Sequence, residues 1–302
     1  MTSSAGGGSE DAPLVKELES RTEIQSICCI TAQHRQMLDD VLGLFAITPD
    51  YDLDIMEDRQ SLYTITSKCL LGLEQVFPGK PDLVLVHGDT STTFSGALAA
   101  FYQKIAVGHV EAGLRTWDRY SPFPEEMNRT LVGDLASLHF CPTPANRENL
   151  LQEGIRDGIF VTGNTVIDAL KTTVQPAYRF RTDLLNTLDY AGKRVILVTC
   201  HRRENYGQPM ENIMGALRRL VEDFPEVELV YPVHLSPAVQ EVARRHLSNH
   251  ERIHLIPPLT PDEMHNLMAR SAFVMTDSGG LQEEAPALGA ACPSAAPGDR
   301  AA

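Results

Sequence analysis

The stretch from Asp82 to Arg129 constrains the fold of this chain more than any other part. It begins with an apolar run, DLVLVH, which ends at a Gly-Asp-Thr sequence and is typical of a strand buried on both faces. The segment STTFSGALAAFYQ follows and predicts a helix, with Thr90 or Ser91 as its N-cap. A second apolar run, KIAVGHV, comes next. A strand, a helix and a strand at this spacing predict a βαβ unit with two parallel strands.

Three carboxylates are expected to meet at one edge of this sheet. Asp89 and Glu111 follow the two predicted strands, and ligands of open α/β sheets bind at the carboxyl ends of the strands. Glu125 enters the same region at the start of a later helix, although acids are also common in the first turn of a helix. Because like charges raise each other's pKa, the nearby Arg115 and Arg129 indicate a partly neutralised cluster that holds an anion.

Strand-like and helix-like segments alternate along the chain, which predicts an α/β fold with parallel sheets. The alternation weakens over residues 169–192 and then resumes. The 302 residues are therefore expected to form two Rossmann-like, doubly wound domains over residues 12–168 and 193–289, joined by an interdomain junction. Residues 1–11 are expected to be a disordered lead, and residues 290–302 a low-complexity tail without a periodic pattern.

The composition argues against several classes of protein. Hydrophobic residues make up 43% of the chain and charged residues 22%, as in ordinary globular domains. The net charge of −14 argues against a general nucleic-acid surface. No apolar stretch reaches the ~20 residues of a transmembrane helix, and the N-terminus lacks the pattern of a signal peptide. The six cysteines form no CxxC pair, so we expect buried thiols of a cytoplasmic protein rather than disulfides or a zinc site.

Two motifs in the second half of the chain indicate an anion site. The TCHRREN motif places His201, Arg202 and Arg203 after a predicted strand. Arg can bind phosphate in a bidentate fork, and His can exchange a proton near neutral pH. The TDSGGLQEEAP motif places two glycines before a helix start, where unpaired N–H groups favour anions. Glu283 and Glu284 then suit sugar hydroxyls, although a strand-end His and helix-start acids also have structural explanations.

Seven motifs together resemble the non-hydrolysing UDP-N-acetylglucosamine 2-epimerases of bacteria. In chain order they are HGDTSTT, HVEAGLRT, SPFPEEMNR, VTGNTVIDAL, TCHRREN, PVHLSP and TDSGGLQEEAP. The resemblance extends from about Ala12 to Gly289. It implies two Rossmann-like domains in the GT-B arrangement, with the active site in the cleft between them. It also implies a homodimeric enzyme that interconverts UDP-GlcNAc and UDP-ManNAc for envelope polysaccharide synthesis, without a metal or an organic cofactor.

The same resemblance implies an elimination and a readdition. UDP leaves C1 while C2 loses its proton, which gives a 2-acetamidoglucal, and UDP adds back after reprotonation on the other face. Proton exchange on two faces requires more than one acid–base group. The residues that match the family's catalytic positions are Asp89, Glu111, Glu125 and His201, the last of which is expected to stabilise or protonate the departing UDP. The residues expected to bind the substrate or UDP are Arg115, Arg129, Arg202, His234, Ser278, Gly279, Gly280 and Glu284.

Bacterial members of this family bind a second UDP-GlcNAc beside the active site as an activator. The residues that match this allosteric site are Gln33, His34, Gln36, Arg59 and Gln60. Without the resemblance, the first three would be interpreted as the polar face of an amphipathic helix.

Both ends of the chain depart from the family pattern. MTSSAGGGSED stands in place of a strand and a GTRPE-type loop, and ACPSAAPGDRAA in place of a strand, a TTERPE-type loop and closing helices. The loss of a strand from each sheet predicts exposed edges and weak or absent activity. Three functions stay open: a 2-epimerase, a hydrolysing epimerase or GT-B glycosyltransferase, and an inactive member that at most binds a nucleotide sugar. The carboxylates favour the epimerase, since a glycosyltransferase needs no base at C2.

Overall fold

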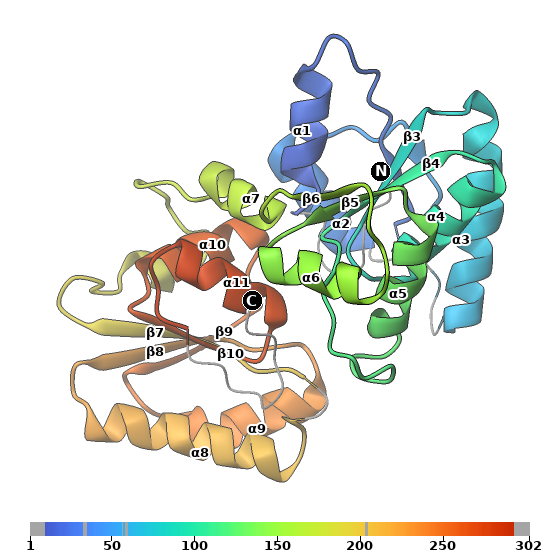
Figure 1. The fold of residues 1–302 in the computed structure, drawn as a ribbon. Helices are drawn as coiled ribbons and strands as arrows, with labels where there is room; N and C mark the ends of the chain where they lie inside the picture. Colours follow the sequence, from blue (N-terminus) through green and yellow to red (C-terminus); the bar gives the residue numbers. More distant parts are fainter. Residues whose placement is uncertain (1–9, 33–34, 56, 58–59, 203–204, 293–302) are drawn as a thin grey trace. The chain divides into compact units, whose positions relative to one another are not determined.

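The computed structural model describes residues 10–292, except 33–34, 56, 58–59 and 203–204 (Figure 1). The chain divides into two compact units, with the boundary between Ala169 and Leu170. Each unit is a set of helices on parallel strands, so the predicted fold class, α/β with two Rossmann-like units, is confirmed.

The first unit contains a four-stranded parallel sheet in the order β3-β4-β5-β6 and a two-stranded parallel sheet, β1-β2. Its strands are β1 (Cys29–Ile30), β2 (Tyr51–Asp52), β3 (Leu83–His87), β4 (Ala106–Val110), β5 (Leu138–Cys141) and β6 (Ile159–Val161). Its helices are α1 (Ala12–Ser20), α2 (Arg35–Phe45), α3 (Leu62–Val76), η1 (Phe77–Gly79), α4 (Ser91–Tyr102), α5 (Glu125–Leu135) and α6 (Pro144–Gln152), followed by α7 (Thr165–Thr173), which crosses the unit boundary.

The second unit is doubly wound around the pair β7 and β10. Its parallel sheet has the order β10-β7-β8-β9, so the strand order reverses between β7 and β10. The strands are β7 (Arg194–Thr199), β8 (Val227–Pro232), β9 (Ile253–Ile256) and β10 (Phe273–Thr276). The helices are η2 (Asp183–Asn186), α8 (Gln208–Asp223), α9 (Pro237–Leu247), α10 (Pro261–Arg270) and α11 (Gly279–Ala287). Such a reversal opens a crevice at the carboxyl ends of the strands, where ligands bind.

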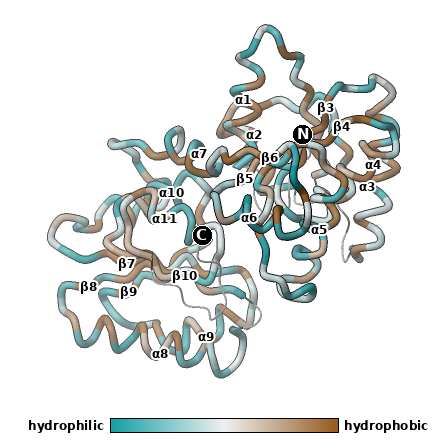
Figure 2. The backbone as a smooth tube through the Cα atoms, in the orientation of Figure 1, coloured by the Kyte–Doolittle hydropathy of each residue, from teal (hydrophilic) through white to brown (hydrophobic). Residues whose placement is uncertain are grey.

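Apolar side chains of the strands form the core of each unit. The strands β7 and β10 of the second unit and β3 and β4 of the first are mostly hydrophobic along the backbone trace (Figure 2). In the first unit, Val86 and Val107 pack against Ala97 and Ala100 of α4. Small residues on this helix allow a close approach to the sheet, which fixes the predicted βαβ unit. Among the described residues, no helix is long and apolar enough to cross a membrane.

The helix starts test two predictions of capping. The hydroxyl of Thr90 accepts a hydrogen bond from the backbone N–H of Thr93 at 3.2 Å, so Thr90 is the N-cap of α4 as expected.

The TPDE sequence predicts a capping box between Thr260 and Glu263. This prediction is wrong, because Thr260 makes no side-chain cap. The Glu263 carboxylate instead accepts the backbone N–H groups of Arg181 and Thr182 at 2.8 and 3.1 Å, which anchors a distant segment.

Residues 169–192 are the segment predicted as the interdomain junction. Most of this segment belongs to the second unit, where Phe180 and Leu185 are buried against β7 and α10. It lacks strand periodicity because it covers the sheet with loops and η2 rather than joining the sheet.

The structure differs from the predicted ends at a few positions. Asp11, placed in the disordered lead, is buried, because it lies against His87. Ala291, placed in the tail, forms an isolated parallel bridge with Phe273. The rest of the two predicted ends, residues 1–9 and 293–302, lies outside the described part of the chain.

Candidate active site

The predicted carboxylates of the first unit follow two neighbouring strands. His87 of β3 is paired with Val110 of β4, so Asp89 and Glu111 leave the sheet at the same edge. Gly88 has a φ of 71°, and its N–H donates to the carbonyl of Val110 at 3.0 Å. A Cβ at Gly88 would lie 3.3 Å from Oε2 of Glu111, so the glycine leaves room for this carboxylate. Glu111 itself has a φ of 63°, an uncommon and costly conformation for a residue with a side chain.

A buried arginine holds Asp89 in place. Nε of Arg129 donates to Asp89 at 2.8 Å, and Nη1 donates to Glu126 at 3.0 Å. Glu126 also accepts the backbone N–H groups of Thr116 and Trp117 at 3.0 and 2.9 Å, which fixes the preceding loop. Arg129 therefore partly neutralises the cluster, as predicted, by pairing with carboxylates of the protein itself. Its contact with substrate stays a prediction. The role of Glu126 is not among the predictions from the sequence, although its i, i+3 spacing to Arg129 was a signal.

Glu125 is the first residue of α5 and is half-buried. Burial raises the pKa of its carboxyl group, and the negative charge of Asp89 adds to this effect, while Arg129 opposes it. A raised pKa brings a carboxyl group closer to the range in which it can both donate and accept a proton at neutral pH. Asp89 and Glu125 therefore act on each other electrostatically, as the sequence predicts for a converging cluster.

A second buried ion pair lies beneath Glu111. Nδ1 of His87 is 2.6 Å from Asp11, and Nε2 is 3.7 Å from Glu111. Burial disfavours the imidazolium, but the carboxylates of Asp11 and Glu111 outweigh it and raise the pKa of His87 to about 10. His87 is thus a cation at neutral pH that faces Glu111 from inside the protein. His87 is not among the residues predicted from the sequence, although it ends the strand just before the Gly-Asp-Thr sequence.

Arg115 makes its described hydrogen bonds within the protein. Its guanidinium forms a bidentate pair with Glu153, at 2.8 and 2.6 Å, and donates to the carbonyl of Leu114 at 2.7 Å. The structure therefore places Arg115 against the end of α6, and its predicted contact with substrate remains a prediction.

A buried aspartate organises the predicted anion site of the second unit. Asp277 follows β10 and is completely buried. It accepts the backbone N–H groups of His201 and Arg202, both at 2.9 Å, and the side-chain amide of Asn205 at 2.9 Å. The loop after β7 is thereby attached to the loop after β10, at the point where the strand order reverses. Asp277 is not among the residues predicted from the sequence, although an acid at the end of a buried strand is a signal of such a role.

Four of the predicted nucleotide-site residues lie together at this point. The rings of His201 and His234 stack with centroids 5.5 Å apart. Nδ1 of His234 accepts the backbone N–H of Ser236 at 3.1 Å, which fixes its ring. A Cβ at Gly279 would lie 3.5 Å from Nη2 of Arg202, so the guanidinium lies beside the start of α11. Two imidazoles and a guanidinium beside a helix N-terminus favour a phosphate group.

The remaining predicted residues of this site belong to the start of α11. Ser278 is the N-cap position, and its backbone N–H donates to the hydroxyl of Thr276 at 2.9 Å. A Cβ at Gly280 would lie 3.8 Å from Oε1 of Glu284, so Glu284 turns back towards the helix start. Glu284 is buried, and its Oε2 has no hydrogen-bond partner among the described residues. A buried carboxylate in this position can accept hydroxyl groups of a ligand.

The predicted allosteric residues are only partly described. Gln33, His34 and Arg59 lie outside the described residues. Gln36 lies in α2, and the side-chain amide of Gln60 donates to the carbonyl of Ile55. The allosteric site therefore remains a prediction.

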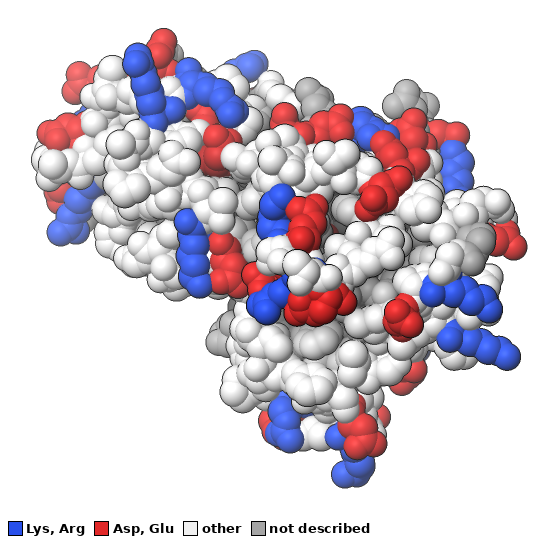
Figure 3. Space-filling model, turned by 90° about the horizontal axis from the view of Figure 1, so that it is seen from above, with Lys and Arg blue, Asp and Glu red and all other residues white. Residues whose placement is uncertain are grey.

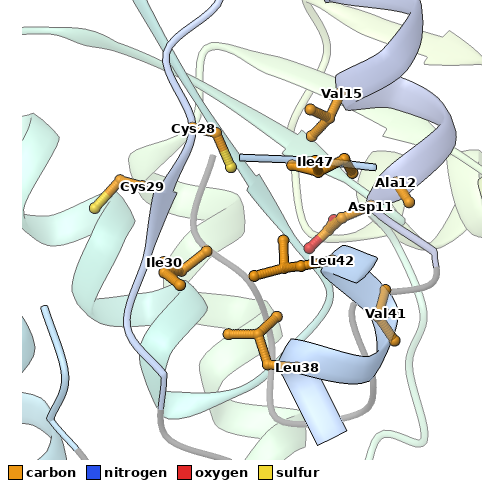
Figure 4. A pocket seen from close by; sticks show the side chains of 10 residues that line it. All are labelled: Asp11, Ala12, Val15, Cys28, Cys29, Ile30, Leu38, Val41, Leu42 and Ile47. Carbon is orange, nitrogen blue, oxygen red and sulfur yellow. The ribbon is translucent and has the colours of Figure 1, made fainter. Parts of the chain in front are cut away.

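Other surfaces of the described chain offer less chemistry. A small pocket lies beside α1, β1 and α2, and ten residues line it (Figure 4). Asp11 is the one charged residue among them, and none is a predicted site residue. On the face shown in Figure 3, acidic and basic side chains are interspersed. Within the described part of the chain, no group of three or more His, Cys, Asp or Glu side chains could hold a metal ion.

The fold and these residues define a Rossmann-like α/β class, with carboxylates at strand ends of the first unit and with His201 and Arg202 at a strand end of the second. The sequence profile of the family described as UDP-N-acetylglucosamine 2-epimerase matches residues 16–294. The UDP-N-acetylglucosamine 2-epimerase of Bacillus subtilis is 57% identical over 281 residues, which cover 92% of this chain and 73% of that protein.

Two solved structures are also similar. The chain resembles the UDP-GlcNAc 2-epimerase of Neisseria meningitidis bound to UDP-GlcNAc, with a TM-score of 0.87 and 46% identity over 95% of this chain and 79% of that one. It resembles S. aureus MnaA in a structure with UDP, with a TM-score of 0.86 and 52% identity over 94% of this chain and 75% of that one. The chain therefore belongs to the non-hydrolysing UDP-N-acetylglucosamine 2-epimerase family, as its motifs predict.

Proposed function

We propose that this protein is an isomerase that inverts C2 of UDP-GlcNAc and forms UDP-ManNAc. The observation that carries the proposal is the acid cluster of the first unit, with Asp89 and Glu111 at adjacent strand ends and a Glu125 whose pKa is raised. Relatives that share about half of the sequence are named for this activity, and one was solved with UDP-GlcNAc. A ligand of the second unit alone would not require three carboxylates in the first.

The proposed chemistry begins with loss of UDP. The C1–O bond breaks, its electron pair leaves with UDP, and a carboxylate removes the C2 proton, so that the C–H electrons form the C1–C2 double bond of a 2-acetamidoglucal. Reprotonation of C2 on the opposite face and readdition of UDP to C1 then give the epimer. Two acid–base groups are needed because the proton leaves one face and returns to the other. Asp89, Glu111 and Glu125 are the candidates for these two roles.

In this proposal the second unit holds UDP during both steps. His201 and Arg202 stabilise the diphosphate, and the N–H groups at the start of α11 face the same charge. The backbone of both residues is bound by the buried Asp277, so these donors need little reorganisation when charge develops on UDP. Ring stacking on His234 further limits the motion of His201.

The test is proton NMR of UDP-GlcNAc incubated with the protein in D2O. Deuterium at C2 together with UDP-ManNAc is the expected result. Free ManNAc and UDP would instead indicate a hydrolysing epimerase, and a requirement for an acceptor would indicate a glycosyltransferase. UDP binding without any exchange at C2 would contradict the proposed activity and leave a nucleotide-sugar binder.

We further propose a homodimer that uses the exposed faces of α3 and α4. These two helices pack against each other, and both have large apolar side chains that are exposed to solvent. The exposed residues are Tyr63, Leu71, Phe101 and Tyr102, with 89%, 65%, 56% and 66% of their surface accessible. Large exposed apolar side chains on neighbouring helices are candidates for an interaction surface. Light scattering should give the mass of a dimer, and Leu71→Glu should shift it towards the monomer.

Two further roles follow from the family resemblance. A second UDP-GlcNAc would act as an activator through the residues predicted for the allosteric site, and sigmoidal dependence of the rate on UDP-GlcNAc would reveal it. The product would supply ManNAc residues for a cell-envelope polysaccharide, which a gene deletion and analysis of the polysaccharide would test.

A further inference from the structure

Glu284 is a buried carboxylate with an incomplete set of partners. It is 7% exposed and lies in α11, behind the glycines at the helix start. Its Oε2 has no hydrogen-bond partner among the described residues, and the nearest ring nitrogen, Nε2 of His265, is 3.5 Å away. A buried charge is costly when it is unpaired. His265 and a bound ligand are therefore the two candidate partners for this carboxylate.

His265 is itself fixed from the opposite side. It lies in α10 and is 4% exposed, and its Nδ1 is 2.7 Å from the hydroxyl of Thr173, the last residue of α7. The adjacent Asn266 binds the same helix end, since its amide donates to the carbonyl of Thr173 at 2.8 Å and accepts the backbone N–H of Gln175 at 2.9 Å. The ring of His265 is therefore held between α7 and Glu284.

The contacts of the ring determine where its proton lies. The tautomer with a proton on Nε2 suits the contact with an ionised carboxylate, because two lone pairs would repel each other. With Nε2 protonated towards Glu284, Nδ1 of a neutral ring accepts from the hydroxyl of Thr173. The ring is thus fixed through one nitrogen while the other contacts a second group, as in metal-bound histidines, where a hydrogen bond to one nitrogen orients the ring.

We propose that His265 is a positioning residue for nucleotide binding, which with Thr173 holds Glu284 in place to accept the ribose hydroxyls of UDP. The inference rests on the proposed function, since it takes UDP as the ligand of the second unit. It assigns a role to α7 as well: the helix that crosses the unit boundary ends on the residue that fixes the ring.

The experiment is calorimetric titration of the full chain with UDP and with 2′-deoxy-UDP, which lacks one hydroxyl that Glu284 would accept. His265→Asn leaves an amide near Nδ1 and removes the group near Nε2. His265→Gln is the matched control, because its amide reaches the position of Nε2 and keeps an N–H group near Glu284. The ratio of the two affinities measures hydroxyl recognition and does not respond to a change that is merely structural.

We expect His265→Asn to weaken UDP binding about tenfold, the effect of one charge-assisted hydrogen bond, and to bring the UDP to 2′-deoxy-UDP affinity ratio close to one. His265→Gln should keep both values within about threefold of the original chain. If His265→Asn does not fold, Thr173→Val decides, with an expected partial fall in the ratio.

An unchanged ratio in His265→Asn, or in Thr173→Val where that variant decides, overturns the inference while leaving the proposed function intact. A fall in His265→Gln as large as that in His265→Asn overturns the role of Nε2. If the original chain does not bind UDP, both proposals are overturned. The titration of the original chain with UDP separates this outcome from the two above.

Discussion

Replacement of Asp277 by alanine tests the organisation of the nucleotide site directly. The side chain is fully buried and accepts hydrogen bonds from the backbone of His201 and Arg202 and from the side chain of Asn205. Asp277→Ala leaves three N–H donors without this acceptor. A buried donor that loses its partner costs about 1–3 kcal/mol.

The lower end of this range applies, because His201 and Arg202 are only partly buried and water can replace part of the loss. We therefore expect the free energy of unfolding to fall by about 3 kcal/mol in Asp277→Ala. That is a large part of the 5–15 kcal/mol that stabilises a typical domain. UDP affinity should fall at least about tenfold, since the loop that carries His201 and Arg202 is released.

Urea denaturation and calorimetric titration with UDP measure the two effects. Asp223→Asn, which changes an exposed acid at the end of α8 in the same unit, is the control and should alter neither value. Asp277→Asn should be intermediate, because an amide oxygen accepts fewer and weaker hydrogen bonds than a carboxylate. A folded Asp277→Ala protein that binds UDP as tightly as the original chain would refute the reasoning.

Two further predictions concern the first unit. Glu125→Gln should abolish deuterium exchange at C2 but leave UDP affinity unchanged, and equal exchange by the variant argues against Glu125 as a base. In the original chain, the exchange rate should fall with decreasing pH at a pH above the ordinary pKa of Glu, because burial raises the pKa of Glu125. The pKa of His87 is raised from 6.5 to about 10 in the folded protein, so its stabilising effect is complete below pH 6.5 and is lost as the pH rises through 10. Urea midpoints across this range should fall with pH, and Asp11→Asn should flatten the change, whereas a pH-independent difference between the two proteins counts against the ion pair.

The sequence by itself determined the elements and the strand ends where the site lies. Apolar runs that stop at Gly-Asp-Thr, at Cys-His-Arg and at Asp-Ser-Gly predict buried parallel strands, because a strand covered on both faces needs no alternation. Parallel pairing then brings Asp89 and Glu111 to one edge without further information. The identities of the nucleotide-site residues came from long motifs rather than from periodicity.

Tertiary structure alone decided which partner each charged group has. Arg115 and Arg129 looked alike in the sequence, yet one is paired with Glu153 and the other with Asp89 and Glu126. Contacts such as that between His265 and Glu284 join residues from different helices, and no local pattern records them. The physical reason is that burial and partner distance set the state of an ionisable group, and both depend on how the elements pack.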